Sequence, residues 1–209
     1  MQKVLSEKEA EDFLEKNSFP ITKRKIAKNL NEVIKFSKEI EYPIALKLSS
    51  KEILHKTDIG AVKLNLQEKD IENAYNELMK IKVKKPKILV QKYTEGKQII
   101  IGLKKDPTFG HVLAFGLGGI FTEILKDVSF RICPITEQDA ELMIQEIKGY
   151  SILKGYRNSS ANIKSIKQIL MKTSELAKKY PKIKELDINP LIVNEKQATI
   201  VDARIIFDS

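Results

Sequence analysis

Residues 88–103 read ILVQKYTEGKQIIIGL, and this stretch decides the fold class. Two short apolar runs, residues 88–93 and 98–103, flank the turn residues Thr94, Glu95 and Gly96. Runs of this length, rich in β-branched residues and bounded by turn residues, are typical of strands. We therefore expect a strand, a turn and a second strand here, as in an antiparallel sheet.

Similar short runs follow this stretch, and helical patterns lie on both sides of it. Strands are expected at residues 43–49, 62–66, 112–115, 120–125 and 128–133, with a final hairpin of residues 183–193 and 198–207. Helices are expected from the capping box Ser6–Glu9, from about Asn31, and at residues 71–81, 136–147 and 162–180. This order predicts an α+β fold with two sublobes, residues 1–87 and 88–209, a cleft between them and a hinge near residues 84–92.

The composition excludes several classes of protein. Of the 209 residues, 42% are hydrophobic and 31% are charged, which is enough apolar surface for a core and argues against disorder. The longest apolar run, residues 112–121, is interrupted by three glycines, so no membrane span is expected. The single cysteine, Cys133, excludes a disulfide framework and a cysteine zinc site. With no signal peptide pattern at the N-terminus, we expect a cytoplasmic protein.

The net charge of +9 does not indicate nucleic-acid binding. Only four of the 37 basic residues are arginine, tryptophan is absent, and the lysines are dispersed along the chain. Readers of nucleic acid need arginine forks and aromatic stacking surfaces. The pattern favours a lysine-rich solvated surface, with no nucleic-acid and no membrane partner expected.

Two features of the first half could carry chemistry. Lys47 lies in an apolar strand between Leu46 and Leu48, either on an exposed strand face or as an ammonium held over a phosphate. The following loop combines His55, Thr57, Asp58 and Gly60 within six positions. His55 is either a solvated loop residue or a group that accepts a phosphoryl group.

The C-terminal hairpin allows a geometric prediction. If its turn is centred between Glu195 and Lys196, paired residue numbers sum to 391, which places Asn189 opposite Asp202 and Asp187 opposite Arg204. Alternation then puts these four side chains on one face of the sheet. The patch is either an ordinary polar face with an Asp187–Arg204 pair, or a Mg²⁺ site of carboxylate and amide oxygens.

The glycine-rich run Gly116–Gly119 is followed by Glu123, Asp127 and Arg131. It is not a Walker loop, because no Gly-Lys-Ser/Thr follows it. It is not a dinucleotide-binding fingerprint, because it joins strands and does not open a helix. Glycines at such a position indicate a bulge or a close backbone approach.

Together these separated motifs resemble one family over residues 5–205, the ATP-grasp β subunits of ADP-forming acetyl-CoA synthetases, in the nucleoside-diphosphate-forming acyl-CoA synthetase superfamily. The matching segments are residues 45–49 (ALKLS), 55–60 (HKTDIG), 115–123 (FGLGGIFTE) and 186–191 (LDINPL). The resemblance implies an ATP-grasp fold that holds ATP or ADP between two α+β lobes. It also implies a subunit that acts with a CoA-binding α subunit, in an α2β2 heterotetramer.

The resemblance further implies roles for single residues. On the nucleotide side, Lys47 would contact phosphates, the segment Gln91, Lys92 and Tyr93 would receive adenine, and Asn189 and Asp202 would hold Mg²⁺. On the phosphoryl side, Asp187 would orient a phosphohistidine of the α subunit and Arg131 would neutralise phosphate charge. His55 would be a second phosphorylatable histidine.

The chain departs from the family at three places. Gln98, a candidate nucleotide contact, stands where the family usually has glutamate; Gly60-Ala61 replaces Gly-Gly; and Phe109-Gly110-His111 replaces Phe-Gly-Pro. Two alternatives therefore stay open: a stand-alone ATP-grasp ligase, and a non-catalytic regulatory subunit that binds nucleotide.

Overall fold

The computed structural model describes residues 2–49, 59–119, 126–155 and 160–208. The chain forms two compact units. The large unit contains Met1–Ile21 and Glu95–Ser209, and the small unit contains Thr22–Thr94. The expected boundary between residues 87 and 88 therefore differs from the observed one, because the first 21 residues belong with the C-terminal part of the chain.

Long-range pairing explains why the N-terminus joins the large unit. Strand β1 (Lys3–Val4) pairs antiparallel with β11 (Ala203–Phe207), and helix α1 (Glu7–Lys16) packs against β11. The capping box at Ser6 and Glu9 is present as predicted. Ala10 and Leu14 of α1 are fully buried in the core of the large unit.

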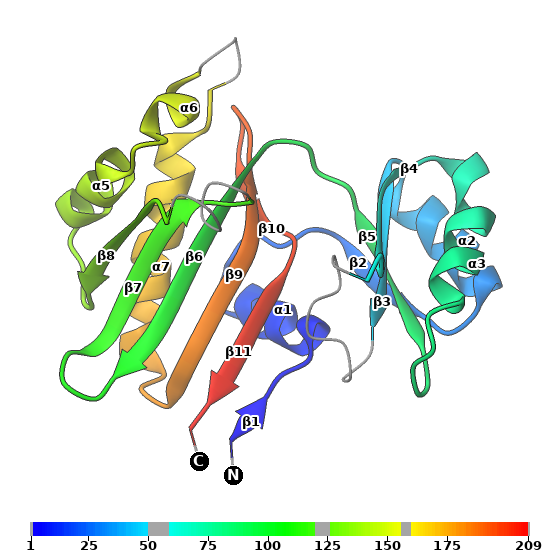
Figure 1. Cartoon of the computed structure of the whole chain (residues 1–209), viewed down its shortest axis with the longest axis horizontal. Helices are drawn as coiled ribbons and strands as arrows, with labels where there is room; N and C mark the ends of the chain where they lie inside the picture. The colour runs from blue at the N-terminus through cyan, green and yellow to red at the C-terminus, as the bar shows by residue number, and fades with distance from the viewer. Residues whose placement is uncertain (1, 50–58, 120–125, 156–159, 209) are drawn as a thin grey trace. The chain divides into compact units, whose positions relative to one another are not determined.

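The small unit is a four-stranded sheet with helices on one face. Its elements are β2 (Arg24–Ala27), α2 (Leu30–Ile40), β3 (Ile44–Ser49), β4 (Val62–Leu66), η1 (Glu68–Asp70), α3 (Ile71–Met79) and β5 (Lys87–Lys92). The strand order is β2-β5-β3-β4 (Figure 1). Val33 and Leu78 of the helices pack with Leu46, Leu48 and Val90 of the strands.

The two strands at residues 88–103 do not form a hairpin. β5 pairs with β2 and β3 in the small unit. By contrast, β6 (Lys97–Asp106) pairs with β7 (Gly110–Leu117) and β9 (Ile183–Val193) in the large unit. The turn at Thr94–Gly96 therefore connects the units, and the segment expected as a hinge is for the most part the regular strand β5. Gly96 is required for close approach, since a Cβ here would lie 2.5 Å from the carbonyl oxygen of Val193.

The large unit is a sheet covered by helices on one face. Its strands run in the order β1-β11-β9-β6-β7-β8, and β10 pairs with β9. The remaining elements are β7 (Gly110–Leu117), β8 (Val128–Ile132), α5 (Glu137–Glu146), α6 (Tyr150–Lys154), α7 (Ile163–Lys179), β9 (Ile183–Val193) and β10 (Ala198–Ile200). Helices α1, α5 and α7 lie against one face of this sheet (Figure 1). We call the other face, which carries Asp187, the open face.

Within the described part of the chain, none of the helices is long and apolar enough to cross a membrane.

Candidate functional site

The C-terminal hairpin has the register predicted from its turn. Ala198 pairs with Val193, and Arg204 pairs with Asp187. Between these two pairs, the amide of Asn189 donates a hydrogen bond to the carbonyl oxygen of Asp202 at 3.1 Å. The register shifts only beyond Ile206, at the end of β11.

Alternation along β9 separates the two faces of the sheet. Leu186 and Ile188 are fully buried in the helix-covered core, so Asp187 and Asn189 lie on the open face. Their partners Asp202 and Arg204 share that face because paired residues project to the same side. The structure therefore brings Asp187 opposite Arg204 as predicted, and the carboxylate of Asp202 acts on Asp187 electrostatically.

The electrostatics of this patch suit a cation. Burial is the main cause that raises the pKa of Asp187 to about 6; the neighbouring carboxylates of Asp202 and Glu185 contribute to the same rise, and Arg204 opposes it. Carboxylates that disfavour each other's ionisation are relieved when a hard cation binds between them and a phosphate.

A magnesium ion needs few protein ligands at such a site. Among the described residues, no group of three or more His, Cys, Asp or Glu is placed to hold an ion by itself. Mg²⁺ is commonly held by one or two carboxylates together with substrate phosphates. The oxygens of Asn189 and Asp202 on the open face fit that requirement.

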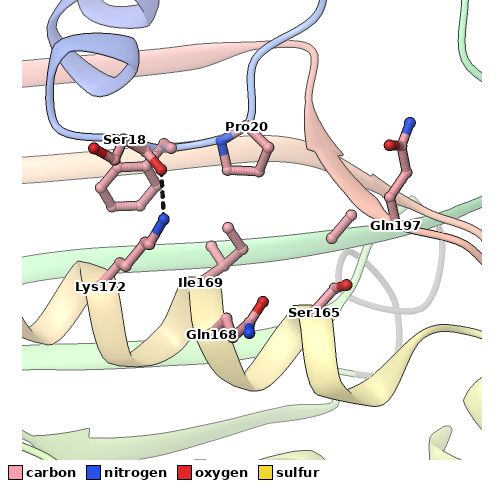
Figure 2. A pocket seen from close by; sticks show the side chains of 9 residues that line it. Ser18, Pro20, Ser165, Gln168, Ile169, Lys172 and Gln197 are labelled. Carbon is pink, nitrogen blue, oxygen red and sulfur yellow. Dashed lines mark hydrogen bonds between the residues drawn. The ribbon is translucent and has the colours of Figure 1, made fainter.

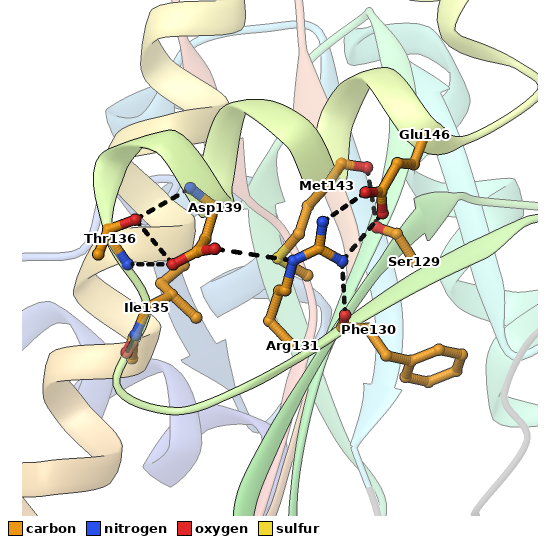
Figure 3. Close-up of polar contacts among 9 residues, drawn as sticks. Ser129, Phe130, Arg131, Ile135, Thr136, Asp139, Met143 and Glu146 are labelled. Carbon is orange, nitrogen blue, oxygen red and sulfur yellow. Dashed lines mark hydrogen bonds and ion pairs between the residues drawn. The ribbon is translucent and has the colours of Figure 1, made fainter.

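Arg131 does not lie on the open face, which corrects the expectation from the sequence. Its neighbour Phe130 pairs with Ala114, and Ala114 pairs with Gly102. Gly102 pairs with Asp187, so Phe130 lies on the open face in the same row as Asp187. Arg131 projects to the opposite side, where its Nη1 donates to Glu146 of α5 at 2.9 Å (Figure 3). Its Nε lies 3.9 Å from Asp139 of the same helix.

Gly118 of the glycine-rich run and Asp127, which follows the run, both make hydrogen bonds within the large unit. The amide of Gly118 donates to the carbonyl oxygen of Gln98 at 2.8 Å, and Gln98 is exposed on the open face. The buried carboxylate of Asp127 accepts hydrogen bonds from the amides of Lys148 and Gly149, each at 2.7 Å. Asp127 therefore holds the connection before α6 in place. Glu123 lies outside the described residues.

Lys47 is buried, so it is not an ordinary lysine on an exposed strand face. It is 5% exposed and lies on the inner strand β3. Leu46 and Leu48, on either side of it, belong to the helix-packed core, so Lys47 projects from the other face of the small sheet. A buried ammonium requires compensating partners, as a phosphate-binding lysine would have.

The three residues expected to receive adenine have different surroundings. Gln91 is 1% exposed and pairs with Ala45, which places its side chain on the same face as Lys47. The ammonium of Lys92 instead donates to the carbonyl oxygens of Glu41 and Tyr42, at the end of α2.

The backbone amides of this segment are also engaged. The amide of Lys92 donates to Lys23, and that of Tyr93 donates to Pro43.

Two of the departures from the family pattern have local explanations. Ala61 is fully buried in the core of the small unit, where its methyl group is accommodated. The Nε2 atom of His111 lies 2.7 Å from the carbonyl oxygen of Ile183, so this imidazole connects β7 to β9. His55 lies outside the described residues.

A pocket of about 340 Å³ lies elsewhere in the large unit. It is formed by the chain after α1, helix α7 and the β9–β10 turn, with Ser18, Ser165, Lys172 and Gln197 in its wall (Figure 2). The ammonium of Lys172 donates to the carbonyl oxygen of Ser18 there. None of the predicted site residues lines this pocket.

Comparison with known proteins identifies the class. The family model of the ATP-grasp domain matches residues 1–207. Subunit beta of ADP-forming acetate–CoA ligase I from Pyrococcus furiosus is 44% identical over 211 residues, which cover 97% of this chain and 91% of that protein.

Solved structures agree with this match. Acetyl-coenzyme A synthetase 1 of Ca. Korarchaeum cryptofilum, in complex with coenzyme A, Ca-AMPCP and HgCl⁺, has a TM-score of 0.92 and 40% identity, covering 99% of this chain and 94% of that chain. A second complex of that enzyme contains coenzyme A and Mg-AMPPCP, with its phosphohistidine segment pointing towards the nucleotide binding site. Its TM-score is 0.86 at 41% identity, covering 99% and 93% of the two chains.

The fold and the match to the family model place the chain in the ATP-grasp class. Within that class it belongs to the family of β subunits of ADP-forming acetate–CoA ligases. This membership confirms the resemblance noted in the sequence and favours an enzyme subunit over both alternatives left open there.

Proposed function

We propose that this chain binds ADP and ATP with Mg²⁺ and exchanges a phosphoryl group between the nucleotide and a phosphohistidine of a partner α subunit. The overall reaction is acyl-CoA + ADP + phosphate to acid + CoA + ATP, and it is reversible. The observation that supports these roles most strongly is the polar open face, with Asp187, Asn189 and Asp202 in the predicted register. The cytoplasmic location and the α2β2 assembly stay predictions.

Different residues would bind different parts of the nucleotide. Asn189 and Asp202 would hold Mg²⁺, which neutralises phosphate charge when it is bound. Lys47 would contact nucleotide phosphates, and Gln91 shares its face of the small sheet. Phosphoryl transfer depends mainly on positioning and charge neutralisation, so these residues need not react covalently.

Asp187 would hold the protonated ring nitrogen of the incoming phosphohistidine in place. Its carboxylate accepts a hydrogen bond from the ring N–H, on the nitrogen that does not carry phosphorus. When the P–N bond breaks and a P–O bond to ADP forms, that proton stays on the ring, and a neutral imidazole leaves. A carboxylate whose pKa is about 6 ionises close to the range in which a histidine titrates.

The test is phosphoryl labelling of the complex with the α subunit. The complex is incubated with γ-labelled ATP and Mg²⁺, and acid-labile label is assigned to each subunit. Label on the α subunit, lost on addition of ADP, is expected. Absence of any acid-labile label, with ATP binding intact, would contradict the proposal.

The same experiment tests the relay through His55. Label on this chain that disappears in His55→Ala supports a relay. Label on the α subunit alone, with turnover unchanged in His55→Ala, means that the α-subunit histidine delivers directly to ADP.

A further inference from the structure

Because Arg131 points towards α5, another basic side chain would have to neutralise the charge of the phosphoryl group. Arg204 and Lys104 both project from the open face of the large sheet. Lys104 lies directly opposite Glu185 on β9. Arg204 lies directly opposite Asp187, in the same patch as Asn189 and Asp202.

The sheet leaves space beside the Asp187–Arg204 pair. On the side of Asp187 away from Arg204, the paired residue on β6 is Gly102, and the next residue in the row is Ala114 of β7. A Cβ added at Gly102 would meet nothing closer than the Cβ of Ala114, at 3.6 Å. The surface next to the carboxylate is therefore made of small residues, which leaves room for a ligand on this side of Asp187.

The charge of Arg204 is available to a ligand. Arg204 is exposed, and it lies opposite Asp187 in the β9–β11 pair on the open face. A guanidinium on this face offers two parallel N–H donors to phosphoryl oxygens.

We propose that Arg204 binds the phosphoryl group that is transferred, the γ-phosphate of ATP. Arg204, Asp187 and Gly102 lie side by side in one row across the open face. This inference rests on the proposed function, because it assigns a cation to the same site. Asp187 orients the histidine ring, and Arg204 neutralises the charge on the oxygens of the phosphoryl group while the P–N bond is exchanged for a P–O bond.

The experiment compares ATP and ADP, which differ by this phosphoryl group. Affinities of the wild type, R204M and R204K for both nucleotides are measured by calorimetry in Mg²⁺. R204M is expected to lose about tenfold in ATP affinity, as one charge-assisted contact would give, and to keep its ADP affinity within about twofold. R204K is expected to fall between R204M and the wild type, since lysine restores the charge and not the fork.

R131M is the matched control, because it removes the same charge from the helix-covered face. It is expected to keep the ATP-to-ADP ratio of the wild type. Equal losses for ATP and ADP in R204M, or no loss in either, would overturn the role of Arg204. If the wild type bound neither nucleotide, the proposed function itself would fail. The R204K protein keeps the test open if R204M does not fold.

Discussion

The amide of Asn189 donates to the carbonyl oxygen of Asp202 at 3.1 Å, between the last pair of β10 and the first pair of β11. This bond continues the ladder across the two residues that separate the short strands. It therefore keeps the backbone of Asn189 beside that of Asp202, so that two different segments can contribute an amide and a carboxylate oxygen to one site. A cation site made this way depends on the register of one hairpin.

Replacing Asp202 by alanine should weaken nucleotide binding only when magnesium is present. Loss of even an outer-shell partner costs about 10–100-fold in metal affinity, and Asp202 is proposed as a direct ligand. We expect at least about a tenfold loss of ADP affinity in Mg²⁺, and no change in EDTA. Titration calorimetry under both conditions checks this. A loss of the same size in EDTA would mean that Asp202→Ala damages the fold.

Lys47→Met should reduce the affinity for ADP while the small unit stays folded. Methionine keeps most of the apolar stem, and only the charge is lost. A charge-assisted hydrogen bond contributes about 1.5–3 kcal/mol, so a loss of about tenfold or more is expected.

Lys63→Met is the matched control for Lys47→Met. Lys63 lies on β4 and pairs with Glu77 of α3, on the helix-covered face of the same sheet. Its replacement should leave ADP binding unchanged. Equal affinity in both variants would show that Lys47 does not touch the nucleotide.

Local patterns explain which parts of the site could be predicted. The hairpin register followed from one turn, because the two strands are close in sequence and each position depends only on the turn centre. The capping box of α1 was equally local. By contrast, the pairing of β1 with β11 joins the two ends of the chain, and no short-range pattern contains that information.

The face of the sheet from which Arg131 projects could not be predicted from the sequence. The position of a residue in one strand shows which of its neighbours share its face of the sheet. It does not show which face the helices will cover. Arg131 alternates with Phe130, and the strand carries the apolar residue on the open face, against the usual rule. The contact with Glu146 of α5 settles the orientation, and it exists only once α5 packs against β8.

Gly96→Ala should destabilise the protein more than Gly102→Ala. An alanine Cβ at Gly96 would lie 2.5 Å from the backbone oxygen of Val193, so the backbone itself must move. Overpacking of this kind costs about 1–3 kcal/mol. At Gly102 the nearest atom is an alanine Cβ at 3.6 Å, an ordinary contact. Urea unfolding of both variants measures the difference, and equal stabilities would contradict the close approach at Gly96.

The unfolding free energy should depend on pH through Asp187. Its pKa is raised from 3.8 to about 6 in the folded protein, mainly by burial. Between these values the folded state holds a proton that the unfolded chain has released, so stability falls as the pH rises through this window. Below the lower value both states are protonated and the cost disappears, whereas above about 6 it is fully present.

Asp187→Asn should therefore stabilise the protein at neutral pH and not in acid. The full shift corresponds to at most about 3 kcal/mol, and the gain should vanish towards about pH 4. Asp139→Asn is a control of opposite sign, because hydrogen bonds from Thr136 lower the pKa of Asp139. It should reduce stability at neutral pH. Urea titrations of both variants across this range check the signs, and a wild type that gains stability relative to Asp187→Asn as the pH rises would contradict the raised pKa of Asp187.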